Sequence, residues 1–516
     1  MTMFSFNHAA MRPSSPARNP STSSADRQPF AVRIAADALV IAGILALFGL
    51  IAWILPAIGE PIGPKGVPSS VSTNLADLPY YALRSVFRMF VALFFSLVFT
   101  FVYGTTAARC RRLSRVLIPL LDILQSVPIL GFLSATITIW MVLFPGSMLG
   151  VEAASIFAIF TSQAWNMAFS FTRSLTSEPR ELDEAARSLR LTRWQRFWTL
   201  DVPNAMIPLL WNCMMSVGGG WFFLTASEMI SVNNHTYALP GIGSFVAQAA
   251  AEENLAAICW AIVTMVAVVL LIDVLLWKPL TAWAEKFRIT QSESTVRKTS
   301  AVLTIIRQSH IDEMLGRLFQ PVGELFDTLT RPLGRTGGRW SVETKSARSR
   351  VLDVLFMVVV VAASAFGVIE LMLVIHRDAG FDELGHALAL GMLTFLRVAL
   401  LTIVCSVIWV PVGALIGMNP RVSRFMQPIV QVLASFPSNF TFPFVTLWFV
   451  ACSVNINWGS ILLMALPTLA IGLLPTYSSV GIIAPLLLLL MRILQGAAIG
   501  GEVPGAWVFV AEHVPE

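Results

Sequence analysis

Long apolar runs, each about as long as a bilayer's hydrocarbon core is thick, limit how this chain can fold. An α-helix needs about 20 apolar residues to cross that core. The sequence holds such runs at Ala38–Ile58, Met89–Ala107, 118–143, 153–172, 204–227, 255–277 and 354–375. Because unpaired backbone polar groups are costly in lipid, we expect each run to be helical. The sequence therefore predicts an all-α, polytopic membrane bundle with about 10–11 transmembrane helices.

Composition excludes an ordinary soluble protein, because 56% of the residues are hydrophobic and 13% are charged. The five cysteines form no CxxC pair and lie mostly in or beside apolar runs, so we interpret them as membrane-embedded thiols. Metal-ligand clusters, glycine-rich phosphate loops and triad spacings are not evident in the sequence. We therefore expect no cofactor and no catalytic site. If ATP drives this protein, a separate subunit hydrolyses it.

Charge gives one consistent orientation. Lys and Arg concentrate in residues 1–30, the segment Arg109–Arg115, residues 175–201 and the segment after Lys278. The intervening loops at 59–83, 144–152 and 231–254 carry few. Basic loops face the cytoplasm. We therefore predict a multi-pass protein of the plasma (inner) membrane with a cytoplasmic N-terminus, and we attribute the net charge of +5 to cytoplasmic loops rather than to a nucleic-acid partner.

A charged segment, residues 175–201, lies between two apolar runs, and we call it the island. It begins with acidic residues that suit a helix N-terminus, namely Glu178, Glu181, Asp183 and Glu184. Thr192 can cap a second helix that runs to about Leu200. Val202-Pro203 then restricts the backbone and is expected to turn the chain back into the membrane. The sequence predicts a helix–turn–helix on the cytoplasmic side.

The spacing of the island resembles a known family pattern. Glu184-Ala185-Ala186, followed by Leu200, Val202 and Pro203, is similar to the EAA loop of ABC importer permeases. The resemblance implies a permease of a binding-protein-dependent importer, with a cytoplasmic ABC ATPase and a periplasmic or extracellular substrate-binding protein as partners. The implied ATPase-coupling residues are Glu184, Ala185, Ala186, Arg190, Leu200, Val202 and Pro203.

Arg190 departs from this pattern, because the family has glycine there. Glycine allows a left-handed turn residue, and arginine costs roughly 1 kcal/mol or more in that conformation. Two explanations follow. Either the turn has a different shape, or the positive charge meets an acidic patch on the partner.

Polar residues inside the expected spans are weaker signals for a translocation path. Gln163, Asn166 and Glu228 could line it. Helix–helix hydrogen bonding is the favoured interpretation of the first two, and Glu228 could instead pair within the bundle or take a solvated interface position. The segment Leu239–Gly243 resembles permeases of the nitrate, sulfonate and taurine importer group. The sequence specifies no substrate beyond that.

An internal repeat indicates two permease units. A constant shift of 309 residues pairs Arg88 with Arg397, Gly104 with Gly413, Arg112 with Arg421, Ser114 with Ser423, Pro119 with Pro428 and Pro128 with Pro437. We therefore predict a disordered cytoplasmic tail (1–30), a leader helix (31–60), a first type-1 unit (80–290), a basic cytoplasmic linker (291–350), a second leader (351–376) and a partial second unit (385–465). Apolar residues at helical spacing over 311–329 predict a helix on the inner leaflet, packed on the permease, or binding a partner.

The repeat fades after Leu466, and position 493, where a second Glu is expected, is Ile. Residues 466–516 contain Arg492-Ile-Leu-Gln-Gly, Gly500-Gly-Glu and Glu512-His-Val-Pro. This pattern resembles metabolite–proton symporters of the major facilitator superfamily. We hypothesise a chimera joined near Leu462–Thr468. Three functions are therefore considered: an ATP-driven importer permease, a fragment of a proton-coupled symporter, and a non-transporting chimeric or truncated permease.

Overall fold

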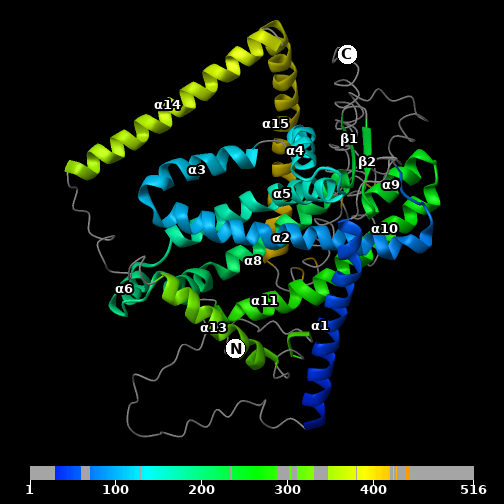
Figure 1. Cartoon of the computed structure of the whole chain (residues 1–516), viewed down its shortest axis with the longest axis horizontal. Coiled ribbons are helices and arrows are strands. Elements are labelled where there is room, and N and C mark those ends of the chain that lie inside the picture. The colour runs from blue at the N-terminus through cyan, green and yellow to red at the C-terminus, as the bar shows by residue number, and fades with distance from the viewer. Residues whose placement is uncertain are drawn as a thin grey trace. The chain divides into compact units, whose positions relative to one another are not determined.

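A computed structural model describes most of the chain (Figure 1). It describes residues 30–59, 70–126, 129–232, 235–287, 302–304, 311–330, 347–378 and 381–418, together with 422, 426, 437 and 440. The expected tail at 1–30, except Phe30, and the symporter-like segment 466–516 lie outside the described residues. So do most of the linker and the later part of the second unit.

Helices account for most of the described residues (Figure 1). They are α1 (Phe30–Ile58), α2 (Leu78–Arg109), α3 (Arg111–Ser126), α4 (Ile129–Leu143), α5 (Leu149–Thr176), α6 (Arg180–Ser188), α7 (Arg193–Arg196), α8 (Val202–Glu228), α9 (Ile242–Ala251), α10 (Leu255–Ile272), α11 (Lys278–Ala284), α13 (Ile311–Thr330), α14 (Ala347–Asp378) and α15 (Phe381–Met418). Short 3-10 turns lie at Leu75–Asp77 and Glu285–Phe287, and π-helical turns lie at Phe197–Asp201 and Asp273–Trp277.

The chain divides into two compact units, and helices α2, α8 and α10 each contribute to both. The first contains residues 1–68, 83–217 and 267–343, and therefore the island, α5 and α13. The second contains residues 69–82, 218–266 and 344–516, and therefore α9, α14 and α15.

Aromatic side chains join α2 to α5 in the first unit. Phe99 packs edge-on against Trp165, with ring centroids 5.4 Å apart, and Phe101 packs against Phe171 at 5.3 Å. A Cβ atom at Gly104 would lie 2.7 Å from Cδ1 of Phe171, so glycine permits the close approach of these helices. The packing brings the last turns of α2 and α5 together, where the island begins.

A buried ion triad also joins α2 to α5. Glu152 accepts hydrogen bonds from Arg84 and from Arg88, whose Nε and Nη2 lie 2.5 and 2.8 Å from the two carboxylate oxygens. All three side chains are buried. Removing one partner of such a group leaves a buried charge unpaired, which typically lowers the free energy of unfolding by about 3–5 kcal/mol.

The second unit contains a feature that the sequence analysis did not predict, an antiparallel hairpin of β1 (Met229–Val232) and β2 (His235–Ala238). The expected fold class was all-α, and this hairpin follows directly on α8. Strand pairing satisfies the backbone groups of residues that leave the helix. The chain then enters α9 through Leu239–Gly243.

Five helical segments in the described part of the chain are long and apolar enough to cross a membrane. They are Leu75–Arg109, Arg193–Glu228, Leu255–Phe287, Val354–Arg377 and Leu384–Ile416. The molecule is thus a helical membrane protein, and the expected total of 10–11 spans stays a prediction. The apolar residues of α14 and α15 are largely exposed, which suits helices that face lipid.

Three expected spans differ in the structure. The run Ala38–Ile58 lies in α1, but only its shorter stretch Val40–Pro56 is found as an apolar helix, so it is not among the five candidate spans. The run 118–143 is divided between α3 and α4, with residues 127–128 outside the described residues. The run 153–172 lies within α5, as expected, but α5 is not among the five candidate spans.

We predict that Glu152→Ala destabilises the protein strongly, because the two arginines lose the carboxylate that they share. The expected result is a fall of several degrees in the melting temperature of the detergent-solubilised chain, corresponding to about 3 kcal/mol or more. Asp122→Ala, which removes an exposed carboxylate from α3, serves as the control. Equal melting temperatures for the two variants would contradict the prediction.

Candidate functional site

The island folds as two short helices joined by a tight turn, as the sequence predicted. The first helix, α6, follows Pro179 and carries Glu181 and Asp183 in its first turn, where the helix dipole favours negative charge. Ala186 is 3% exposed and faces inward, while Glu184 and Ala185 are exposed. The amphipathic helix therefore buries one face and leaves the other uncovered.

Arg190 adopts the left-handed conformation, with φ of 49°. The Arg190 N–H donates to the Arg187 carbonyl at 3.0 Å, and the Leu191 N–H donates to the Ala186 carbonyl at 3.3 Å. This pair of bonds is the Schellman motif that commonly ends helices at glycine. The explanation that the turn has a different shape is therefore wrong. The turn keeps the left-handed residue, and arginine there costs about 1–2 kcal/mol.

Thr192 starts the second helix with a capping box, which confirms its predicted role. Its hydroxyl accepts the Gln195 N–H at 3.1 Å, and the Gln195 side chain accepts the Thr192 N–H at 3.0 Å. Each bond satisfies a backbone donor that the helix leaves unpaired. The capping box therefore stabilises the turn next to Arg190, whose left-handed backbone conformation is strained.

Val202-Pro203 does not redirect the chain, contrary to the prediction. The backbone stays helical from Arg193 to Glu228, through the π-helical turn Phe197–Asp201. The Val202 N–H bonds to the carbonyl of Phe197, five residues back. Proline is tolerated in the first turn of a helix, and the wider π turn realigns the two segments. The island therefore connects rigidly to α8.

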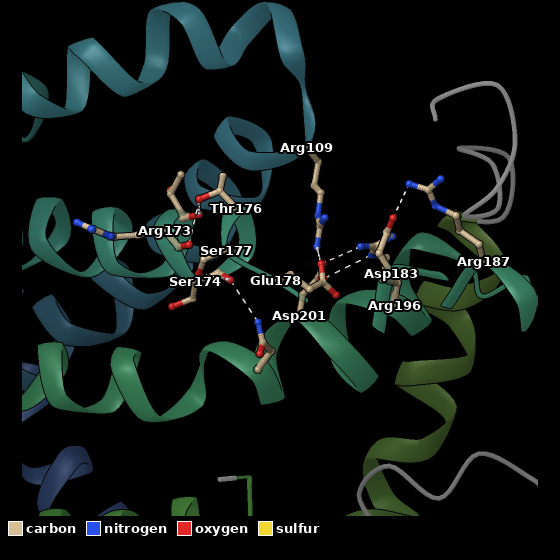
Figure 2. A network of polar contacts seen from close by, with 12 residues as sticks. Arg109, Arg173, Ser174, Thr176, Ser177, Glu178, Asp183, Arg187, Arg196 and Asp201 are labelled. Atoms are coloured by element: carbon tan, nitrogen blue, oxygen red, sulfur yellow. Dashed lines mark hydrogen bonds and ion pairs between the residues drawn. The ribbon is translucent and has the colours of Figure 1, made fainter. Parts of the chain in front are cut away.

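Buried ion pairs attach the island to the end of α2 (Figure 2). Nη2 of Arg109 lies 2.7 Å from Oε2 of Glu178 and 2.6 Å from Oδ1 of Asp201. Glu178 precedes α6 and Asp201 precedes α8, and their carboxylates are 5% and 4% exposed. One guanidinium group thus contacts both flanks of the island.

Arg196 contacts the same two carboxylates from within the island. Its Nη2 lies 3.0 Å from Glu178 Oε2, and its Nη1 lies 2.6 Å from Asp183 Oδ1. Arg187 completes the set through an ion pair with Asp183 one helical turn away. We call these residues the ion cluster: Arg109, Glu178, Asp183, Arg187, Arg196 and Asp201.

Partial burial raises the pKa of Asp183, but the hydrogen bond and charge of Arg196, with those of Arg187, outweigh it and hold this pKa below its usual value. A lowered carboxylate pKa stabilises the folded state above the pKa of the unfolded chain, and this contribution is lost as pH falls through the folded pKa. The contact of Asp183 with Arg196 is therefore fully formed at neutral pH.

The sequence analysis missed the ion cluster. It assigned Glu178 to a helix N-terminus and singled out neither Asp201 nor Arg196 as a partner for Arg109. A signal was present, because the charges at 109, 178 and 201 each stand at the edge of an apolar run. Charges that stand at the same membrane surface are candidates for pairing.

Gln163 and Asn166, predicted for the translocation path, have different surroundings on α5. Gln163 is fully buried, accepts a hydrogen bond from Ser96 at 3.4 Å and directs Nε2 at the Met89 sulfur at 3.1 Å. Asn166 is exposed. The helix–helix interpretation therefore fits the contacts of Gln163. Participation in a path stays a prediction for both.

Glu228, in the second unit, is fully buried, so the interpretation as a solvated interface residue is wrong. Its Oε2 accepts the Gly243 N–H at 2.6 Å, at the start of α9. A Cβ at Gly241 would lie 2.2 Å from the Glu228 carboxyl carbon, and one at Gly243 would lie 2.4 Å from the Thr225 carbonyl. The two glycines of the Leu239–Gly243 segment thus permit a carboxylate to cap α9.

Residues 96–276 match the family described as "Binding-protein-dependent transport system inner membrane component". The match covers less than half of the chain and includes the whole island. This part of the molecule is therefore similar to the multi-pass inner-membrane permeases of ABC transport systems, which work with an ATPase and a binding protein.

A second similarity is short. The chain is 56% identical over 58 residues to a putative proline/betaine transporter of Staphylococcus aureus (strain COL), and 49% identical over 57 residues to the proline/betaine transporter of Salmonella typhimurium (strain LT2). It is also 49% identical over 57 residues to the glycine betaine/proline/ectoine/pipecolic acid transporter OusA of Dickeya dadantii (strain 3937). These alignments cover 11% of this chain and 11–12% of the relatives, so the chain spans about an eighth or less of their length.

We predict that Arg190→Gly stabilises the chain by about 1 kcal/mol, because glycine adopts the left-handed conformation without strain. The melting temperature in detergent measures the change. Ser188→Gly is the matched control, since Ser188 is the last residue of α6 and glycine there is expected to destabilise by roughly 0.5 kcal/mol. Destabilisation by both substitutions would refute a strained Arg190.

We expect Arg109→Ala to free the island from α2, because the buried carboxylates of Glu178 and Asp201 lose a partner. Hydrogen exchange of the backbone amides in residues 178–201 should become faster. Arg115→Ala is the control, because Arg115 is an exposed arginine of the same basic segment. If the two variants exchange alike, the ion cluster does not hold the island.

Proposed function

We propose that the chain is a transmembrane permease subunit of an ATP-driven ABC importer. In this proposal it forms the substrate path and couples to a separate cytoplasmic ATPase through the segment from Glu184 to Pro203. The family match over residues 96–276 supports the transport class. The geometry of the island supports the coupling role.

The proposal rests on one observation: α6 has an exposed face, and the ion cluster holds the same segment to the rest of the molecule. Glu184, Ala185, Leu189 and Arg190 are exposed, and the Leu189 side chain is 70% exposed. An apolar side chain beside Glu184 and Arg190 offers a partner both an apolar and a charged contact. The ion cluster beneath this face would pass a displacement of the island to α2 and α8.

The finer architecture is also a proposal: two type-1 units fused in tandem, the second incomplete. The repeat pairs α2, which ends at Arg109, with α15, which ends at Met418. The paired residues Arg88 and Arg397, and Gly104 and Gly413, lie inside these two helices. This placement supports a duplicated unit, preceded in each case by a leader helix, α1 or α14.

The proposed partners are a cytoplasmic ABC ATPase and a periplasmic or extracellular substrate-binding protein, with the N-terminus in the cytoplasm. The Leu239–Gly243 segment favours a substrate of the nitrate, sulfonate or taurine class. Its contacts with Glu228 and Thr225 explain its glycines by packing, so the substrate class depends on the resemblance alone.

The short similarity to proline/betaine transporters favours a second candidate, a fragment of a major facilitator symporter. Its length of 57–58 residues is close to that of the symporter-like segment 466–516. A chimeric permease that docks an ATPase but does not transport is the third candidate.

We predict that an ABC ATPase co-purifies with the tagged full-length chain from native membranes. Glu184→Lys combined with Leu189→Asp should lower its recovery by about tenfold, because the pair reverses a charge and places a carboxylate in an apolar contact. Glu253→Lys, a charge reversal at an exposed residue outside the island, is the control.

Vesicle uptake separates the candidates. Uptake that requires ATP supports the importer, and proton-driven uptake without ATP supports the symporter. ATPase binding without uptake supports the non-transporting permease. Recovery of no ATPase from wild-type membranes would overturn the coupling proposal.

A further inference from the structure

Helix α13 of the linker packs on α7, the second helix of the island. Of the positions expected for it, which were the inner leaflet, the permease and a partner, this contact supports packing on the permease. The Phe326 ring stacks on the Trp194 ring, with centroids 4.9 Å apart and planes 17° apart. The Thr192 hydroxyl donates to Asp327 Oδ1 at 2.6 Å. Asp327 is 6% exposed, so this hydrogen bond is buried.

Both contacts fall on residues that define the end of the strained turn. Thr192 is the cap of α7 and lies two residues after Arg190. The Thr192 hydroxyl accepts a hydrogen bond from the Gln195 N–H and donates one to Asp327. The first bond caps α7 and the second binds α13, so this one group serves both contacts. Trp194 lies in the first turn of α7. Helix α13 therefore holds the start of this short helix from outside.

Helix α7 is the first turn of the continuous helix Arg193–Glu228, and a first turn is easily frayed because its backbone N–H groups have no partners within the helix. The capping box stabilises α7 from within, and the left-handed Arg190 opposes the turn that leads into it. The stacked ring and the buried hydrogen bond of α13 act in favour of the same turn. The contact offsets the strain that Arg190 introduces.

Coverage of the island is one-sided. Helix α13 contacts Thr192 and Trp194, while Glu184 and Ala185 on α6 and Leu189 just after it stay exposed. A partner that grips the island can reach α6 without displacing α13. It would meet the apolar Leu189 beside one acidic and one basic group, Glu184 and Arg190.

We propose that α13 is a supporting helix of the coupling site: it holds α7 in place and so presents the α6 face to the ATPase. The inference rests on the proposed function for its partner. The ATPase surface that fits this face has an apolar pocket for Leu189, with a basic group near Glu184 and an acidic group near Arg190. The linker is thereby part of the docking unit and does not compete with the ATPase.

Phe326→Ala tests the support directly. Hydrogen exchange in the full-length chain should become about tenfold faster for the amides of α7, the change that 1.4 kcal/mol produces. Recovery of the ATPase should fall by a similar factor. Leu325→Ala is the matched control, because Leu325 is the neighbouring apolar residue and is 58% exposed.

Arg190→Gly combined with Phe326→Ala distinguishes support of the strained turn from a general packing loss. Glycine removes the strain, so the double variant should regain most of the protection of α7. Hydrogen exchange alone is the readout here, because Arg190 also belongs to the face that meets the ATPase. Protection that stays low in the double variant would overturn the link between α13 and Arg190.

Two further results decide the rest. Unchanged exchange in Phe326→Ala would show that α13 does not support α7, and increased ATPase recovery would show that α13 competes with the ATPase; either overturns the inference. If wild-type membranes give no ATPase at all, the proposed function fails, and the exchange of α7 still decides whether α13 supports the island.

Discussion

The contact of Arg109 with two buried carboxylates governs how the island is held. Glu178 and Asp201 stand at the two ends of the island, so one guanidinium group of α2 holds both ends. Desolvated carboxylates are costly unless they are paired, so the cluster constrains geometry more than it adds stability. Because Arg196 binds the same carboxylates, the inside of the island and its attachment to α2 are parts of one network.

The turn at Arg190 shows how a departure from a family pattern can keep the backbone of that pattern. The left-handed conformation and both Schellman hydrogen bonds are present, although the residue is not glycine. The capping box of Thr192 and the packing of α13 stabilise the turn, and so offset the conformational cost of arginine there. At this turn, arginine in the place of glycine occurs together with a packing contact from α13, which is distant in the sequence.

Much of this could be predicted from sequence, because the determining patterns are local. Apolar run length predicted α1, α2 and α14, and Thr192 was identified as a helix cap from its position before the second arm. The ion cluster could not be predicted in the same way, because residues 109, 178 and 201 are distant in the sequence. Pro203 was misread, because proline ends a helix in the interior yet is accepted in a first turn, and sequence alone does not show the π turn before it.

The last residue of α2, Arg109, bears on whether the two proposed permease units would move in the same way. The repeat pairs Arg109 with Met418, the last residue of α15. A thioether is at most a weak hydrogen-bond acceptor and carries no charge, so it cannot bind two carboxylates. In the proposed tandem architecture, an ionic contact with two carboxylates at this position is therefore confined to the first unit. The two units would then respond unequally when a partner closes on them.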